Sequence, residues 1–168
     1  MHGFVRVLSL ASLICAALIL GLTLTHVLQA PGSRTLSGAE WLAVQHTFYG
    51  GFAIVGGIAE VVGLITSATL AVISCARRTP AAAVAPLIAA LCFLGTLLVF
   101  WFGNRPVNAH VAIWTPETLP SDWSLYRDSW ETAHALSAGL GAIAFLTLAI
   151  ALIWRTAPHA GKADSPSF

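Results

Sequence analysis

The sequence predicts an all-α integral membrane protein, a four-helix up-down bundle with a long polar outer segment between the third and fourth helices. Of its 168 residues, 57% are hydrophobic and 9% are charged, whereas soluble domains carry about 25% charged residues. A chain this poor in charge cannot cover a soluble surface, so we expect it to lie in a lipid bilayer. Four apolar runs also reach the roughly 20 residues that cross a bilayer.

The whole chain, residues 1–168, is predicted to form a single membrane domain. Its net charge of +1 gives no indication of a nucleic-acid partner. The cysteines stand singly in apolar stretches and are interpreted as small core residues: Cys15, Cys75 and Cys92. The predicted helices are at about 4–28, 41–74, 82–103 and 122–154, followed by a disordered tail at 156–168. The sequence leaves open whether the protein forms a homo-oligomer.

The first apolar run, at about 4–28, has the position of a secretory signal peptide. Its apolar stretch is longer than the usual 7–15 or so residues, and Leu28 fits poorly at the −3 position of a cleavage after Ala30. We therefore expect this run to remain in the protein as the first membrane helix.

The second run carries a face of small residues between a histidine and a glutamate. At about 100° per residue, this face comprises His46, Gly50, Ala53, Gly57 and Glu60. It is either a close helix–helix contact, which small residues favour, or the wall of a narrow cavity. A carboxyl near mid-membrane must face the bundle interior and find a partner or be protonated. We expect Glu60 to serve in a proton relay or in helix pairing.

The third run, at about 82–103, ends abruptly in polar residues within the stretch "FWFGNRPVNAHVAIW". Asn104 suits a helix end, and Pro106 suits the first turn of a new helix. These roles leave Asn108 unexplained. Primary amides beside Arg105 at the mouth of a pocket can bind carbonyl or phenol oxygens, or the backbone of a re-entrant segment.

The fourth helix is predicted to begin near residue 122, capped by Ser121 or Asp122. Tryptophans gather at this outer level, where a belt of interfacial aromatic residues is the ordinary explanation: Trp41, Trp101, Trp114, Trp123 and Trp130.

The distribution of basic residues indicates the orientation of the helices. One set lies in the link between the second and third helices and beside the termini: Arg6, Arg77, Arg78, Arg155 and Lys162. It outnumbers the set on the other side: Arg34, Arg105 and Arg127. The positive-inside rule then places both termini in the cytoplasm of a multi-pass protein of the cell membrane.

Histidines from separate segments fall at the outer level, where a bundle could bring them together: His26, His46, His110 and His134. One interpretation is a metal site, because imidazole suits zinc, copper and iron. Glu131 and His134 form a Glu-x-x-His pair, but di-iron bundles need two such pairs. We therefore predict no metal at this site.

The other interpretation is acid–base chemistry, since neutral histidine exchanges protons near pH 7. Glu131 lies one helical turn from both Arg127 and His134 and is placed to orient the histidine. The simpler alternative is an ion pair between Glu131 and Arg127 at the start of a helix.

The second half of the chain resembles the anthrone oxygenase-like family of small four-helix membrane proteins. The family pattern runs roughly N-x-P-x-N, a tryptophan, then W-x-x-x-R-x-x-W-x-x-x-H. Here it matches the following residues: Asn104, Pro106, Asn108, Trp114, Trp123, Arg127, Trp130 and His134. The resemblance covers most of residues 8–154, with a weaker likeness in the first half. It departs from the pattern at Ser137, where relatives often carry an arginine.

The resemblance implies a cofactor-independent oxygenase that uses O₂ on an anthrone-like or other acidic aromatic substrate. In that reading His134 is the base, and the substrate anion is held by Arg127, Asn104 and Asn108. The tryptophans Trp114, Trp123 and Trp130 pack the flat rings, and His26, His46 and His110 complete the binding site. The alternative is a non-enzymatic membrane protein for partner binding, assembly or small-solute transport, with the motif as a structural latch.

Overall fold

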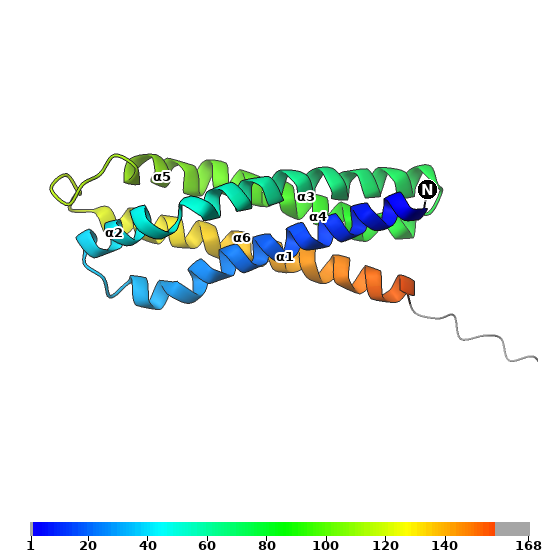
Figure 1. The fold of residues 1–168 in the computed structure, drawn as a ribbon, viewed down its shortest axis with the longest axis horizontal. Coiled ribbons are helices and arrows are strands. Elements are labelled where there is room, and N and C mark those ends of the chain that lie inside the picture. Colours follow the sequence, from blue (N-terminus) through cyan, green and yellow to red (C-terminus); the bar gives the residue numbers. More distant parts are fainter. Residues whose placement is uncertain (1, 157–168) are drawn as a thin grey trace, which may run out of the picture.

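The structure, a computed structural model, describes residues 2–156 of the chain. Its elements are α1 (His2–Ser33), α2 (Gly38–Phe48), α3 (Gly50–Ala76), α4 (Pro80–Val99), the π-helical turn η1 (Phe100–Asn104), α5 (Arg105–Val111) and α6 (Trp123–Thr156) (Figure 1). The predicted tail lies, apart from Thr156, outside the described residues. Within the described part the protein is all-helical, as predicted.

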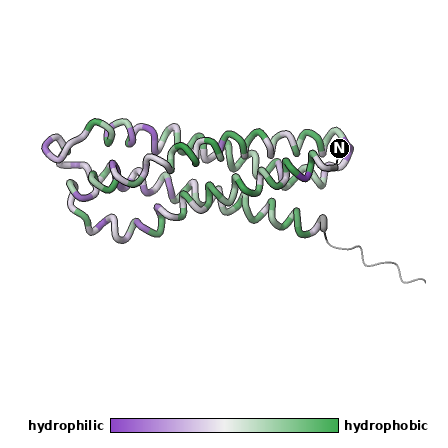
Figure 2. The backbone as a smooth tube through the Cα atoms, viewed as in Figure 1, coloured by the Kyte–Doolittle hydropathy of each residue, from purple (hydrophilic) through white to green (hydrophobic). Residues whose placement is uncertain are grey.

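Four helical stretches in residues 2–156 are long and apolar enough to cross a membrane. They are Gly3–Ser33, Gly50–Ala76, Pro80–Val111 and Trp123–Trp154. The prediction from composition, that the chain contains helices long and apolar enough to cross a membrane, is therefore confirmed. Hydrophilic residues gather at the end of the molecule that carries α2 and α5 (Figure 2).

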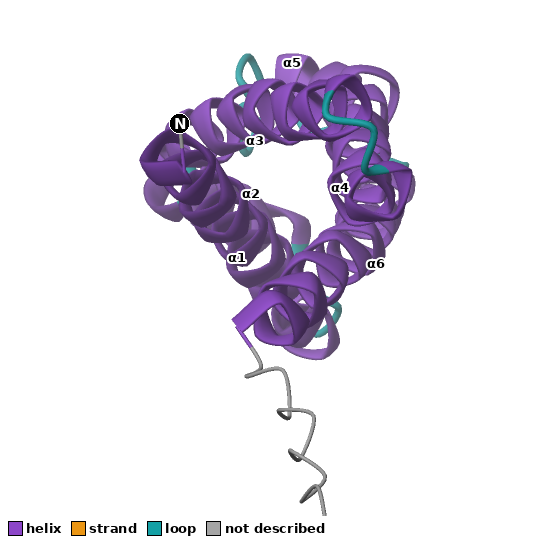
Figure 3. Ribbon diagram, turned by 90° about the vertical axis from the view of Figure 1, so that its right-hand side faces the viewer, coloured by secondary structure: helices purple, strands orange, loops and turns teal. Residues whose placement is uncertain are grey.

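The long helices close into a ring. α1 packs against α3 and α6, and α4 packs against the same two helices, so the long helices surround a common axis (Figure 3). The start of α1 and the end of α6 lie at the same end of this ring, opposite α2 and α5 (Figure 1).

The predicted second helix, 41–74, is two helices with a break at Tyr49. Ser37 begins α2 with a capping box, in which its hydroxyl and its backbone N–H contact the Glu40 carboxylate at 2.7 and 2.8 Å. These two bonds lower the pKa of Glu40 below its usual value. The pair Gly50–Gly51 follows Tyr49, and glycine weakens a helix interior by about 1 kcal/mol per residue, which favours the break.

The predicted third helix does not end at 103 but continues to Val111. The π-helical turn η1 absorbs the change in register, and α5 begins with proline in its first turn, as the sequence indicated for Pro106. Gly103 in η1 lies against α6, where an added Cβ would come within 2.8 Å of the Ala133 Cβ. The predicted polar outer segment is therefore helical in its first part and irregular only from 112 to 122.

Two apolar cores hold the helices together. One core, which we call the lower core, lies between α1, α3, α4 and α6 and contains two of the cysteines. It is formed by Cys15, Ala16, Ile19, Ala59, Ala89, Cys92, Phe93, Ala144 and Leu148. Cys75 is exposed rather than buried, contrary to the prediction, because it lies near the exposed end of α3.

The upper core corrects the prediction of a tryptophan belt. Its buried members are Trp41, Leu42, Val107, Val111 and Trp130, with Trp114 and Trp123 packed against them. Of the predicted belt, Trp101 is exposed, at 54% of its surface, with Arg105 4.5 Å over its ring. The other tryptophans lie between α2, α5 and the start of α6, so they face the upper core.

Candidate functional site

A cavity of about 310 Å³ lies between α1, α3, α5 and α6 at the outer half of the ring. The small-residue face of the second predicted helix lines it completely, with His46, Gly50, Ala53, Gly57 and Glu60 all at its wall. No side chain lies within 4 Å of a Cβ added at Gly50 or Gly57. This face is thus a cavity wall, and the alternative of a close helix–helix contact is wrong.

His26 from α1 and His134 from α6 pack against each other, with tilted rings, in this cavity, which we call the inner cavity. Their ring centroids are 4.0 Å apart and their planes are inclined by 37°. His26 is 4% exposed. The Nδ1 atoms of both rings are buried and have no hydrogen-bond partner. Two adjacent imidazoles with unpaired nitrogens can exchange a proton with a bound molecule or with each other.

Aromatic rings enclose the histidine pair. Trp130 packs edge-on against both rings, at 4.7 Å from His26 and 4.2 Å from His134. Tyr49 and Phe52 pack against His26 at 4.8 and 5.2 Å. These rings give the pair an aromatic wall, which suits the binding of a flat apolar molecule.

The two asparagines of the predicted motif hold α6 to the third membrane span. Asn104 is buried, and its Nδ2 donates to the backbone carbonyl of Trp130 at 3.3 Å. Trp130 in turn donates its Nε1–H to Asn108 Oδ1 at 3.0 Å. Both asparagines also line the inner cavity. Within residues 2–156, Asn108 Nδ2 has no hydrogen-bond partner, so it is available as a donor to a bound molecule.

His46 also lines the cavity, but its Nε2 already lies 2.8 Å from the backbone carbonyl of Val111. This contact joins α2 to the end of α5. The hydrogen bond gives His46 a structural role as a connection between these two helices.

The floor of the inner cavity is polar. Thr23, Glu60 and Ser137 line it from α1, α3 and α6, and each is at least nine-tenths buried. Glu60 therefore faces the interior, as predicted for a carboxyl in mid-membrane. The departure from the family pattern, Ser137, lies directly on the cavity.

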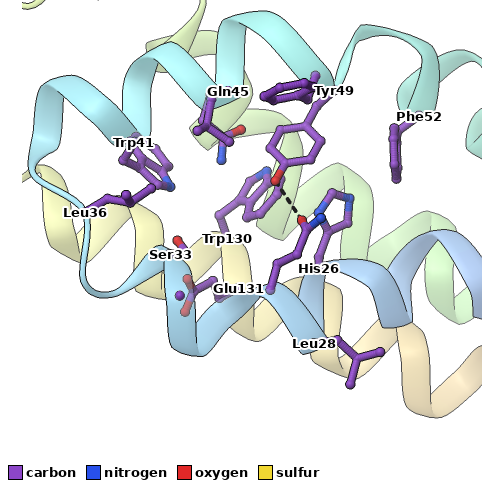
Figure 4. A pocket seen from close by; sticks show the side chains of 14 residues that line it. His26, Leu28, Ser33, Leu36, Trp41, Gln45, Tyr49, Phe52, Trp130 and Glu131 are labelled. Carbon is purple, nitrogen blue, oxygen red and sulfur yellow. Dashed lines mark hydrogen bonds between the residues drawn. The ribbon is translucent and has the colours of Figure 1, made fainter.

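A second, outer groove of about 640 Å³ lies between α1 and α2 (Figure 4). It shares His26, Gln45, Tyr49, Phe52 and Trp130 with the inner cavity. These residues form the wall between the two spaces.

The Tyr49 hydroxyl donates to Gln29 Oε1 at 2.9 Å across this wall (Figure 4). Burial, and secondarily the negative charge of Glu131, raise the pKa of Tyr49 above its usual value. The phenol therefore remains a donor at neutral pH.

Glu131 pairs with Arg34, not with Arg127 as the sequence suggested. Arg34 Nε lies 3.0 Å from Glu131 Oε2 and joins the link after α1 to α6. Glu131 Oε1 is buried without a hydrogen-bond partner. The residues are 97 positions apart, so helical spacing did not reveal the pair.

Arg127 and three aromatic residues of the predicted site do not line the inner cavity. Arg127 pairs with Asp128 at 3.0 Å and lies 5.2 Å over the Trp123 ring. Trp123 packs on Trp41, and His110 and Trp114 pack with each other and with Tyr126. These residues form the outer cover of the cavity.

Sequence reasoning missed Tyr49 and Phe52, which contact His26. The double glycine after Tyr49 was the available signal of a break in the helix. In the described part of the chain, no three His, Cys, Asp or Glu side chains come together in a way that could hold a metal ion.

Compared with models of protein families, with curated proteins and with solved structures, the chain matches none of them.

Proposed function

We propose that the protein is a membrane-embedded, cofactor-independent oxygenase that acts on an anthrone-like or other acidic aromatic molecule. The observation that carries this proposal is the contact between the rings of His26 and His134, which have unpaired Nδ1 atoms and lie in an aromatic-walled cavity. The cavity volume of 310 Å³ lies at the lower end of the roughly 300–1,000 Å³ of small-molecule sites. The sequence resemblance to anthrone oxygenase-like proteins supports the same chemistry.

In the proposed reaction, His134 takes the acidic C–H proton of the substrate and leaves an electron-rich anion. Asn108 Nδ2 donates to the anionic oxygen and stabilises the charge that forms there. The carbanion carbon passes an electron to O₂, and recombination forms a C–O bond, giving a hydroperoxide. Removal of the remaining proton on that carbon breaks the O–O bond. The products are a new carbonyl and water.

His26 serves as the neighbouring proton acceptor in this scheme. A base of this kind contributes about 10²–10⁴-fold in rate. Because Arg127 lies outside the cavity, we assign it to the outer cover. The substrate oxyanion is then bound by the asparagine amides.

Oxygen consumption by the purified protein with anthrone as substrate tests the proposal. The wild type should consume one O₂ per quinone formed, and His134→Gln should lose activity by the factor above while staying folded. Thr132→Ala is a matched control, because this exposed hydroxyl on α6 bonds only to the backbone of its own helix. Equal turnover by wild type and His134→Gln would contradict the proposal.

A second candidate function has its own observation in favour. Asn104 and Asn108 both bond to Trp130, so the motif works as a structural latch between α6 and the third span. A non-enzymatic role in partner binding, assembly or solute passage needs no more than this latch. Absence of oxygen consumption with anthrone and with simple phenols would favour it.

We further propose that the helices form an up-down bundle in the cell membrane with both termini in the cytoplasm. The basic residues at the α3–α4 link and beside the termini support this orientation. Labelling of Arg78→Cys and Glu117→Cys with an impermeant thiol reagent, in a Cys75→Ser background, tests it in intact cells. Only position 117 should react, and reaction at position 78 would reverse the orientation.

A further inference from the structure

The outer groove contains a buried carboxylate of which only one oxygen is paired. Glu131 lines the groove from α6, and its side chain is 5% exposed. Its Oε2 accepts the 3.0 Å bond from Arg34 Nε, whereas its Oε1 is buried and has no hydrogen-bond partner within residues 2–156. Leaving such an oxygen without a donor is unfavourable, so the groove is suited to a ligand that donates a hydrogen bond. Glu131 does not line the inner cavity, and the proposed reaction does not use it.

The electrostatics of the groove favour a cationic donor over a neutral one. In the part of the chain that the structure describes, no lysine or arginine lines the groove. The Arg34 side chain is 61% exposed, so solvent screens its charge more than the charge of Glu131. The pKa of Tyr49, on the same groove, is raised by burial and then by the negative charge of Glu131, so that charge acts within the groove. A donor that carries a positive charge therefore complements this site.

The aromatic rings of the groove suit the same cation. Trp41 and Trp130 line the groove, together with Tyr49 at the break between α2 and α3 and Phe52 on α3 (Figure 4). Ammonium groups are attracted to the faces of such rings, and most strongly to that of tryptophan. A carboxylate oxygen and several aromatic rings on one groove thus indicate an ammonium ligand.

The remaining side chains of the groove suit an amine that carries an apolar group. Leu28 and Phe48 line the groove and are 72% and 65% exposed, so apolar surface continues from the groove to the outside of the molecule. Ser33 and Gln45 also line it, and neither side chain has a hydrogen-bond partner within residues 2–156. Their oxygens can accept further N–H groups of an ammonium, which has three to donate.

We propose that the outer groove binds a primary ammonium compound with an apolar body. An N–H of the ligand donates to Glu131 Oε1, and its charge lies against the rings of Trp41 and Trp130. The site is independent of the proposed oxygenase reaction and needs no turnover. Free alkylamines and arylalkylamines carry this ammonium chemistry, and so does the ethanolamine headgroup of a phospholipid. The experiment therefore distinguishes these two sources.

Probes with the same phenylethyl group separate the contribution of charge from that of hydrogen bonding. At pH 7, 2-phenylethylammonium carries both a charge and N–H donors. Its N-trimethyl derivative carries the charge without a donor, and 2-phenylethanol carries a donor without the charge. Binding to the full chain in phosphatidylcholine nanodiscs is followed by the change in tryptophan fluorescence, with the signal of empty nanodiscs subtracted.

The wild type should bind the primary ammonium about tenfold more tightly than either of the other probes, which is the effect of one charge-assisted hydrogen bond. Glu131→Gln should bring the ratio between ammonium and alcohol to about one. Arg34→Gln should keep or raise this ratio, because it retains the carboxylate and removes the competing cation. Both variants break the same ion pair, so their opposite effects separate ligand binding from loss of stability.

Asp128→Asn is the matched charge control. Asp128 lies on the same helix as Glu131, is 53% exposed and does not line the groove, so this variant should keep the wild-type ratio. An equal affinity of the wild type for the ammonium and the alcohol would overturn the inference. An unchanged ratio in Glu131→Gln would overturn it too, as would a ratio lost equally in Arg34→Gln and Glu131→Gln.

The source of the ammonium group is identified by repeating the titration in nanodiscs that contain phosphatidylethanolamine. A lower apparent affinity for 2-phenylethylammonium in these nanodiscs would show competition and assign the groove to the lipid headgroup. An unchanged affinity would assign it to a free amine. Both results uphold the ammonium site, provided that the wild type shows the tenfold ratio and Glu131→Gln loses it.

Discussion

The His26 ring on α1 packs against the His134 ring on α6, with the centroids 4.0 Å apart and both Nδ1 atoms unpaired. Two imidazoles at this distance cannot both carry a positive charge in an apolar enclosure, because the charges would repel at low dielectric. The pair therefore carries at most one positive charge and acts as one unit.

Because the two histidines act as one unit, we expect the effects of their substitution on turnover to be non-additive. His26→Gln and His134→Gln should each lower oxygen-dependent turnover of anthrone, by up to about 10²–10⁴-fold for the base itself. The double variant should be no slower than the slower single variant, because groups that act together are not independent. Initial rates in an oxygen electrode measure this, and multiplied effects would show that the rings act separately.

Trp130 is expected to contribute stability through its hydrogen bond to Asn108. Trp130→Phe keeps the aromatic wall but removes the Nε1–H, and should lower the free energy of unfolding by about 1 kcal/mol. Combined with Asn108→Ala in a double-mutant cycle, it should show a coupling of about 0.5–1.5 kcal/mol. Unfolding in mixed micelles measures both values.

Trp101→Phe is the control for that cycle, because Trp101 is mostly exposed and lies outside the latch. A coupling near zero between positions 108 and 130 would mean that the latch contributes no stability.

The ion pair between Arg34 and Glu131 predicts a rescue. Arg34→Gln leaves a buried carboxylate on α6 without its partner and should lower the thermal midpoint. The double variant Arg34→Gln/Glu131→Gln should lie closer to the wild type, because it leaves no unpaired charge. Thermal unfolding of the three proteins in the same detergent checks this order, and a double variant less stable than Arg34→Gln would refute it.

The close contact of α1 with α6 predicts a sharp difference between two neighbouring glycines. A Cβ at Gly141 would lie 3.1 Å from the Leu20 backbone nitrogen, whereas nothing lies within 4 Å of one at Gly139. Gly141→Val should therefore cost about 1–3 kcal/mol of stability through overpacking. Gly139→Val should cost much less, so similar losses for both variants would argue against this helix contact.

The sequence by itself determined the features that depend on composition and helical period. Low charge and four apolar runs determined the four helical stretches that are long and apolar enough to cross a bilayer. The 100° period placed His46, Gly50, Ala53, Gly57 and Glu60 on one face, and the structure finds that whole face on the cavity. Local spacing suffices for such features because a helix repeats the same geometry at every turn.

The tertiary structure decided which faces meet. The pairs His26–His134 and Arg34–Glu131 join α1 or its following link to α6, and no local period relates residues so far apart in the chain. The break at Tyr49 and the continuation of the third span through η1 also depend on packing against neighbouring helices. Arg127 had an equally good partner by spacing in Glu131, but in the structure Glu131 pairs with Arg34 and Arg127 pairs with Asp128.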